Sequence, residues 1–234
     1  MKTIRRSEER GRGRHGWLDS HHTFSFANYY DPAHMGFRAL RVLNEDRVAP
    51  GRGFGTHPHQ NMEIISYLLD GALEHADSAG NTATIVPGEV QLMSAGRGVA
   101  HSERNASNAE GVHFLQIWIT PRRHGTEPRY EQRAFPVETR RGRWRRLVSP
   151  DGGGDDGSLR IDQDATLWGA LVAPGEHLTY DLAPTRGAWL HVVRGAIEID
   201  QTVLRAGDAI AIEDEASVAL TARETSELLL FDLA

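Results

Sequence analysis

Two short motifs carry side chains of the types that bind metal ions. They are His57-Pro58-His59 and His101-Ser102-Glu103. In an extended strand, residues i and i+2 point to the same face, so each motif presents two ligating groups on one side. If the two strands are neighbours, three imidazoles and a carboxylate converge, which suits a divalent first-row transition metal such as Fe, Mn, Co, Ni, Cu or Zn. Pro58 removes a backbone donor, so its strand is expected at a sheet edge or a bulge.

A second carboxylate competes for the same role. Glu63 follows His59 by four residues, an even spacing that also predicts a shared face. Residue spacing alone leaves Glu63 and Glu103 as alternatives. The other nine histidines have no partner at ligand spacing and are interpreted as surface, loop or core residues, although His21 and His22 are placed to reach the site from the N-terminal arm. They are His15, His21, His22, His34, His75, His113, His124, His177 and His191.

Composition narrows the function classes. The chain of 234 residues has no cysteine, which excludes disulfides, thiolate ligands and a cysteine nucleophile. No stretch approaches the length of a membrane helix, and the charged N-terminus has no apolar core behind it, so we expect a cytoplasmic protein without a signal peptide. Net charge is −6, and the only basic cluster, residues 140–146, is interpreted as a solvated connector or strand edge. We therefore expect no nucleic-acid or membrane partner, and a monomer.

The chain is expected to be all-β. Short aliphatic and β-branched runs alternate with Gly, Pro, Asp or Asn, which is typical of a sandwich or barrel. The predicted strands are Phe37–Leu43, Ile64–Leu69, Thr82–Val86, Val90–Met93, Val112–Thr120, Leu167–Val172, His177–Leu182, Trp189–Val193, Ala196–Ile199, Ala209–Ile212 and Leu228–Leu233.

Two halves of the chain look like copies of one unit. Residues 67–74 align with 191–198, which sets Gly71 over Gly195, and residues 84–90 align with 203–209, which sets Gly88 over Gly207. A Gly- and Asp-rich segment at 149–158 is expected to be a mobile loop and to mark the division. We predict two domains, a metal-binding one at 1–140 and a degenerate one at 141–234.

The second copy lacks the ligands. Under the same alignment, His57, His59 and Glu63 correspond to Asp181, Ala183 and Gly187, whereas His101 and Glu103 correspond to Leu220 and Ala222. One metal ion per chain is therefore expected, with the C-terminal domain as support for the first.

The glycines and ligands together resemble two cupin motifs. Gly51, His57-x-His59, Glu63 and Gly71 resemble the first motif. Gly88, Ser94-Ala-Gly96, His101 and Asn105 resemble the second, although Ser94 replaces the usual proline and the spacer before His101 is long. Three stretches, 22–31, 57–63 and 95–103, narrow the similarity to the pirin family, and in particular to short bacterial pirin-like quercetin 2,3-dioxygenases.

The resemblance implies a bicupin fold and a fourth ligand from the second motif, which is Glu103. Glu63 is then expected to support the ligands or the structure, because a fifth ligand would leave little room for substrate. The implied cofactor is one divalent transition metal ion, for which we expect Fe2+. The implied reaction is the opening of a flavonol ring by O2 with release of carbon monoxide, in which Glu103 also accepts the hydroxyl proton.

Two other hypotheses use the same residues. One is a metal-dependent, redox-responsive module that binds a regulatory protein. The other, a metal-dependent isomerase, would need cationic contacts to a phosphate, and only Arg97 and Arg104 lie near the motifs. For the enzyme, apolar contacts to a flat aromatic substrate are expected from Phe37, Leu40, Ile64, Leu92, Phe114 and Ile117, each of which also suits plain core.

Overall fold

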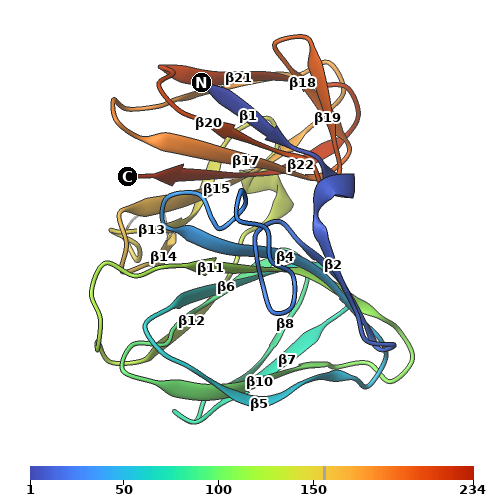
Figure 1. The fold of residues 1–234 in the computed structure, drawn as a ribbon, viewed down its shortest axis with the longest axis vertical. Helices are drawn as coiled ribbons and strands as arrows, with labels where there is room; N and C mark the ends of the chain where they lie inside the picture. The colour runs from blue at the N-terminus through green and yellow to red at the C-terminus, as the bar shows by residue number, and fades with distance from the viewer. Residues whose placement is uncertain (155–156) are drawn as a thin grey trace. The chain divides into compact units, whose positions relative to one another are not determined.

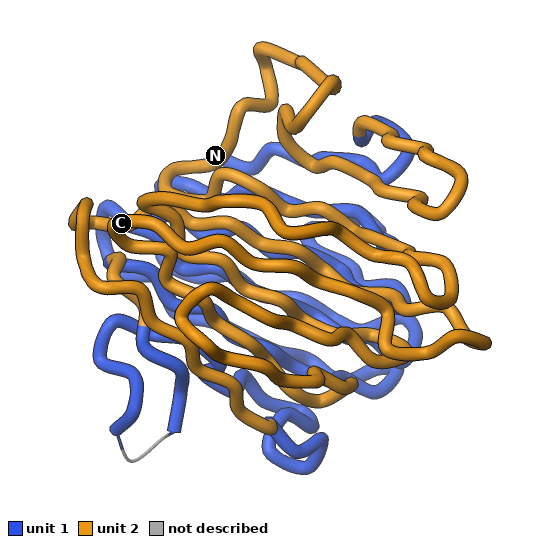
Figure 2. Tube along the Cα trace, turned by 90° about the horizontal axis from the view of Figure 1, so that it is seen from below, with its two compact units in different colours: residues 1–10, 135–160, 164–234 blue, residues 11–134, 161–163 orange. Residues whose placement is uncertain are grey.

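The computed structural model describes residues 1–154 and 157–234, and it contains two compact units. Figure 2 colours them separately: one comprises residues 11–134 and 161–163, and the other residues 1–10, 135–160 and 164–234. We call them the N-terminal and C-terminal barrels. The helical segments of the described residues are two 3₁₀ turns, Ser7–Glu9 and Val137–Thr139, so the all-β prediction is confirmed.

The N-terminal barrel consists of two sheets (Figure 1). The seven-stranded sheet has the order β12-β9-β6-β11-β4-β3-β2, and the four-stranded sheet has the order β5-β10-β7-β8. The strands of the larger sheet are β2 (Gly11–Arg14), β3 (Leu18–His22), β4 (Leu40–Val48), β6 (Glu63–Asp70), β9 (Glu89–Ser94), β11 (Val112–Ile119) and β12 (Arg129–Ala134). Those of the smaller sheet are β5 (Gly53–His59), β7 (Leu73–Asp77), β8 (Thr82–Ile85) and β10 (Val99–Asn105).

The C-terminal barrel repeats this plan. Its sheets have the orders β1-β20-β17-β22-β15-β13-β14 and β16-β21-β18-β19. The larger sheet contains β1 (Lys2–Arg5), β13 (Arg145–Ser149), β14 (Leu159–Arg160), β15 (Ala165–Val172), β17 (Gly187–Arg194), β20 (Ala209–Ile212) and β22 (Ser226–Leu233). The smaller sheet contains β16 (His177–Asp181), β18 (Ala196–Ile199), β19 (Thr202–Arg205) and β21 (Ser217–Ala222).

The four-stranded sheets correspond in strand order, and so do the strands β9-β6-β11-β4 and β20-β17-β22-β15 of the larger sheets, which confirms the internal duplication. The aligned glycines also share a backbone conformation, because φ is 80° at Gly71 and 81° at Gly195, and 91° at Gly88 and 85° at Gly207. These left-handed angles strain any residue with a side chain. A Cβ would in addition lie 2.7 Å from a backbone oxygen at Gly71 and 2.3 Å from one at Gly195. Glycine at both turns is therefore required by the duplicated fold.

The division of the chain differs from the predicted boundary at residue 140. β1 pairs in register with β20 over Lys2–Arg5, so the first ten residues belong to the C-terminal barrel. The Gly- and Asp-rich segment connects β13 to β14, which pair in parallel inside that same barrel. It therefore does not separate the two units, and Asp155 and Asp156 within it lie outside the described residues. Across the part of the chain that is described, no helix has the length and apolar character to cross a membrane.

The interiors of the two barrels differ in chemistry. In the C-terminal barrel, apolar side chains from both sheets, among them Leu190, Ile197, Leu220 and Leu230, fill the interior. In the N-terminal barrel, apolar packing is divided between two smaller clusters, one that includes Leu68, Leu73 and Phe114 and one that includes Ile64 and Met93. The rest of that interior carries polar and ionisable side chains, and these form the site.

Candidate functional site

Strands β5 and β10 bring the two predicted motifs together. They are antiparallel neighbours, and His57 lies directly opposite His101 in the register. β5 is the edge strand of its sheet, so the missing amide of Pro58 costs no sheet hydrogen bond on the outer side. The register also shifts by one residue between His101 and Glu103, which marks a bulge in β5. Both predicted consequences of Pro58, an edge and a bulge, are thus present.

Three imidazoles converge at this pairing. Ligand atoms of His57, His59 and His101 all lie within 4.8 Å of one another. The Nδ1–H of His57 donates to the carbonyl of Gly55 at 2.8 Å, which leaves its Nε2 lone pair free. His101 is 1% exposed, and its Nε2 has no hydrogen-bond partner among the described residues. A buried nitrogen in this state fits a metal ligand, because buried polar atoms are otherwise almost always paired.

The charge state of these histidines also favours the binding of a cation. Burial lowers the pKa of His59 to about 4, and the neighbouring His57 adds to the effect. Burial lowers the pKa of His101 to about 3, with His57 and His59 contributing. The rings of His59 and His101 are therefore neutral near pH 7, the form in which imidazole binds a metal.

Glu103 lies next to this cluster and is held at both carboxylate oxygens. Ser66 Oγ donates to Oε1 at 3.1 Å, and Gln116 Nε2 donates to Oε2 at 2.6 Å. Glu103 also offers an oxygen within 4.8 Å of a nitrogen of His101 and of His75. Burial raises the pKa of Glu103, while the hydrogen bonds from Gln116 and Ser66 oppose the increase. A bound cation would stabilise the ionised form further.

Glu63 is directed elsewhere. Its carboxylate accepts a hydrogen bond from Ser94 Oγ at 2.7 Å, and Arg129 contributes a favourable charge. Glu63 and Ser66 are three residues apart on β6, so they lie on opposite faces of the sheet, and Ser66 is the one that contacts Glu103. The even spacing between His59 and Glu63 does not place them on a shared face, because a turn with Asn61 at φ 51° separates β5 from β6. Neither group of potential metal ligands found among the described residues contains Glu63.

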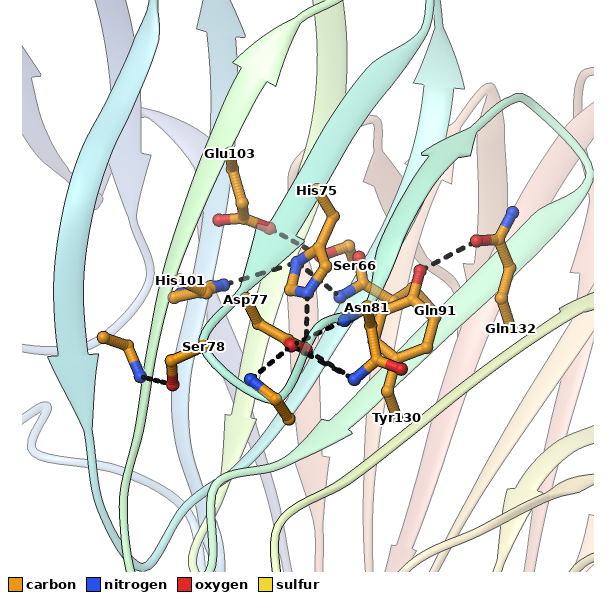
Figure 3. Close-up of polar contacts among 12 residues, drawn as sticks. Ser66, His75, Asp77, Ser78, Asn81, Gln91, His101, Glu103, Tyr130 and Gln132 are labelled. Carbon is orange, nitrogen blue, oxygen red and sulfur yellow. Dashed lines mark hydrogen bonds and ion pairs between the residues drawn. The ribbon is translucent and has the colours of Figure 1, made fainter.

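His75 and Asp77 on β7 lie beside His101 (Figure 3). In the register, Asp77 lies opposite His101 and His75 lies opposite Glu103. His75 Nε2 lies 3.2 Å from Asp77 Oδ2, and His75 Nδ1 lies 3.2 Å from Gln91 Nε2 and 3.5 Å from His101 Nδ1. Burial acts to raise the pKa of Asp77, but hydrogen bonds from Asn81 and His75 outweigh it and the pKa is lowered.

This network sets the protons on the rings. The Asp77 anion accepts the proton of His75 Nε2, so His75 Nδ1 accepts from the Gln91 amide and from His101 Nδ1–H. The remaining nitrogen of His101 is then the unprotonated Nε2 that faces His57 and His59. His75 is a core residue, one of the interpretations given above, but the statement that it has no partner at ligand spacing is wrong, because Asp77 is its partner. The signal was present in the sequence, because His75-Ala76-Asp77 has the same two-residue spacing as the ligand motifs.

A cavity of about 270 Å³ opens beside the cluster. Its walls include His57, His59 and Glu103, together with aromatic and apolar side chains from other strands and loops. These are Trp17, Leu18, Phe26, Phe54 and Trp118. Trp118 packs edge-on against His59 with ring centroids 4.9 Å apart. None of the six apolar residues expected to contact a substrate lines this cavity, since most of them belong to the packed core.

Another wall of the cavity is polar. Ser20, His22, Asn44 and Asp46 line it from β3 and β4, and all four are buried. Burial raises the pKa of Asp46 to about 7 against a hydrogen bond from Ser20, and the Glu103 charge adds to the increase. Burial lowers the pKa of His22 to about 4. His22, which the sequence places within reach of the site from the N-terminal arm, lies in this wall. Ser20, Asn44 and Asp46 were not identified from the sequence, because the alternation of side chains along a strand is the same whether one face meets the core or a cavity.

Comparison with known proteins gives matches over both barrels. Residues 4–119 match the family model described as Pirin. Residues 146–233 match the model described as Quercetinase C-terminal cupin domain.

Full-length relatives and structures are also similar. A protein of Escherichia coli (strain K12) named quercetin 2,3-dioxygenase is 48% identical over 233 residues, which cover 100% of this chain and 99% of that one. A pirin-like protein of Caulobacter vibrioides is 44% identical over 94% of each chain. The crystal structure of bacterial pirin YhhW from Escherichia coli in complex with nickel(II) has a TM-score of 0.94 at 47% identity, covering 100% of this chain and 99% of that one.

Proposed function

Because the chain belongs to the pirin family, we propose that it is a metal-dependent dioxygenase that opens the ring of a flavonol with O2 and releases carbon monoxide. The observation that carries the proposal is the unpaired, buried Nε2 of His101, which meets His57 and His59 at the wall of an aromatic cavity. A metal-binding His/Glu site of this kind in a chain so similar to a quercetin 2,3-dioxygenase favours oxygenase chemistry on a flat phenolic substrate.

His57, His59, His101 and Glu103 would hold the metal. Three neutral imidazoles and a carboxylate suit several divalent ions, and we propose Fe2+ for the cell while noting that a relative binds nickel(II). When bound, a divalent ion lowers the pKa of a coordinated hydroxyl and so favours the anionic, electron-rich form of a flavonol.

The side chains of the cavity then have distinct tasks. Ser66 and Gln116 hold the two oxygens of Glu103, so that this carboxylate is oriented toward the cluster and toward a hydroxyl that enters beside it. Glu103 would accept the hydroxyl proton, because it is a carboxylate held beside the place where the hydroxyl would bind. The rings of Phe26, Trp118 and Phe54 would stack on the substrate and exclude water.

The test is aerobic incubation of the Fe2+-loaded protein with quercetin. We expect bleaching of the flavonol absorbance, uptake of O2 and release of carbon monoxide. A His57→Ala variant and the chelator-treated protein should show none of the three. If the fully loaded protein also shows none, the oxygenase proposal is wrong and the module that binds a regulatory protein becomes the better hypothesis.

A further inference from the structure

The four buried side chains of the polar cavity wall form a compact group, which we call the polar quartet: Ser20, His22, Asn44 and Asp46. In the register of β3 and β4, Ser20 lies opposite Asp46 and His22 lies opposite Asn44. Residues two apart on each strand share a face, so all four face the interior of the barrel. The quartet is therefore a two-by-two square of polar groups on the inner face of the seven-stranded sheet.

The quartet has unused hydrogen-bonding capacity. His22 Nδ1, Asn44 Oδ1 and Asp46 Oδ1 are buried and have no hydrogen-bond partner among the described residues. Native interiors rarely retain such atoms without a ligand or ordered water to pair with them. Since all three residues line the cavity, a molecule inside it is the available partner.

Aromatic contacts run from the quartet to the metal cluster. The His22 ring packs edge-on against Phe26 with centroids 5.2 Å apart, and Phe26 packs edge-on against Trp118 at 5.4 Å. Trp118 in turn contacts His59. The cavity is thus lined by the histidine cluster and Glu103, by aromatic rings and by the polar quartet. A molecule that fits these surfaces is a flat aromatic compound with hydroxyl groups at two separated positions.

We propose that the polar quartet is a specificity subsite for ring hydroxyl groups of the flavonol that lie away from the metal. The proposal rests on the proposed function. A phenolic hydroxyl can donate to Asn44 Oδ1 or to Asp46 Oδ1, so it matches two of the free atoms of the quartet. A site built to hydrogen-bond a hydroxyl discriminates strongly against an analogue that lacks it, because its buried polar atoms stay unpaired.

The experiment compares the binding of two flavonols to the nickel(II)-loaded protein without O2. Quercetin carries hydroxyl groups on both outer rings, whereas 3-hydroxyflavone has only the hydroxyl that reaches the metal. Quenching of tryptophan fluorescence reports binding, since Trp17 and Trp118 line the cavity. The variants are Asn44→Leu and Asp46→Leu, which remove a polar atom at similar volume. The control is Glu45→Gln, which lies between them on β4, faces away and pairs with His113.

We expect the wild-type protein and the Glu45→Gln variant to bind quercetin at least about 10-fold more tightly than 3-hydroxyflavone. Each Leu variant should lose most of this preference while its affinity for 3-hydroxyflavone stays within about 2-fold of wild type. An unchanged preference in a folded Leu variant, or an equal loss for both flavonols, overturns the subsite but leaves the proposed function standing. If the wild-type protein binds neither flavonol, the proposed function fails and the subsite fails with it.

Discussion

Ser66 and Gln116 lie directly opposite each other on β6 and β11, and each donates a hydrogen bond to a different oxygen of Glu103. This pair belongs to a polar row that crosses six adjacent strands in register. The row contains His22, Asn44, Gln116, Ser66, Gln91 and Gln132. One end of the row lines the cavity, the middle holds Glu103, and Gln91 supports His75. The larger sheet therefore supports the proposed ligands, which the smaller sheet carries.

Removing a hydrogen bond from Glu103 should weaken the metal site without abolishing it. We expect Gln116→Leu to reduce nickel(II) affinity about 10- to 100-fold, the usual effect of losing a group that orients a ligand. Isothermal titration calorimetry measures the change. Gln132→Leu is the control, because Gln132 belongs to the same row but bonds to Thr84 and Glu89. Equal losses in both variants would mean that Gln116 acts on the fold and not on Glu103.

Glu103 and Glu63 should differ sharply as ligands. Glu103→Ala removes an oxygen proposed to bind the metal, whereas Glu63→Ala removes a carboxylate that pairs with Ser94 on the opposite face. Metal retained after gel filtration should therefore fall far more in Glu103→Ala, to the level of His57→Ala as reference. Circular dichroism checks that each variant is folded. Retention of metal by Glu103→Ala and its loss by Glu63→Ala would reverse the assignment.

His75 should act through the ring of His101. In His75→Leu, the Nδ1 proton of His101 loses its acceptor, so the ring is free to rotate and to change tautomer. We expect nickel(II) affinity to fall about 10- to 100-fold. The matched control is His113→Leu, since His113 is another largely buried histidine paired with a carboxylate, Glu45. A metal affinity that is equal to wild type in a folded His75→Leu variant would exclude the positioning role.

Asp46 should make the metal-free protein less stable at alkaline pH. Its pKa rises from 3.8 in the unfolded chain to about 7 in the fold, so the folded state binds the proton more tightly. The stability linked to this proton is present in full below pH 3.8 and is lost as the pH rises through 7. Asp46→Asn carries no such titration, so its Tm should exceed that of wild type by several degrees at pH 8. Thermal scans at pH 5 and pH 8 test this, and a Tm difference that does not grow with pH contradicts it.

The stoichiometry should be one metal ion per chain. The ligands have no counterparts in the C-terminal barrel, where Leu220 belongs to the apolar core. Elemental analysis of protein purified without chelator is the measurement. Two ions per chain would reveal a site in the C-terminal barrel that the alignment of the two copies misses.

Many structural features of this protein are determined by short segments of the chain, and they were therefore predictable from the sequence. Strand periodicity, glycine at the turns and the spacing of His57, His59, His101 and Glu103 all depend on residues close together in the chain. The same is true of the duplication, because Gly71 and Gly195 need the same left-handed backbone for the same turn. Local geometry of this kind leaves a direct trace in residue order.

The tertiary structure decided what depends on the pairing of distant strands. Residue spacing placed Glu63 and Glu103 on equal terms, and only the family resemblance favoured Glu103. In the structure, the turn at Asn61 between β5 and β6 directs Glu63 away from the histidines. The sequence also did not predict that Asp46 lies near Glu103 or that Gln91 contacts His75, because these contacts follow from the register of strands that are far apart in the chain. Alternation states which residues share a face of a strand. Only the pairing of strands and the packing of one sheet on the other determine what that face meets.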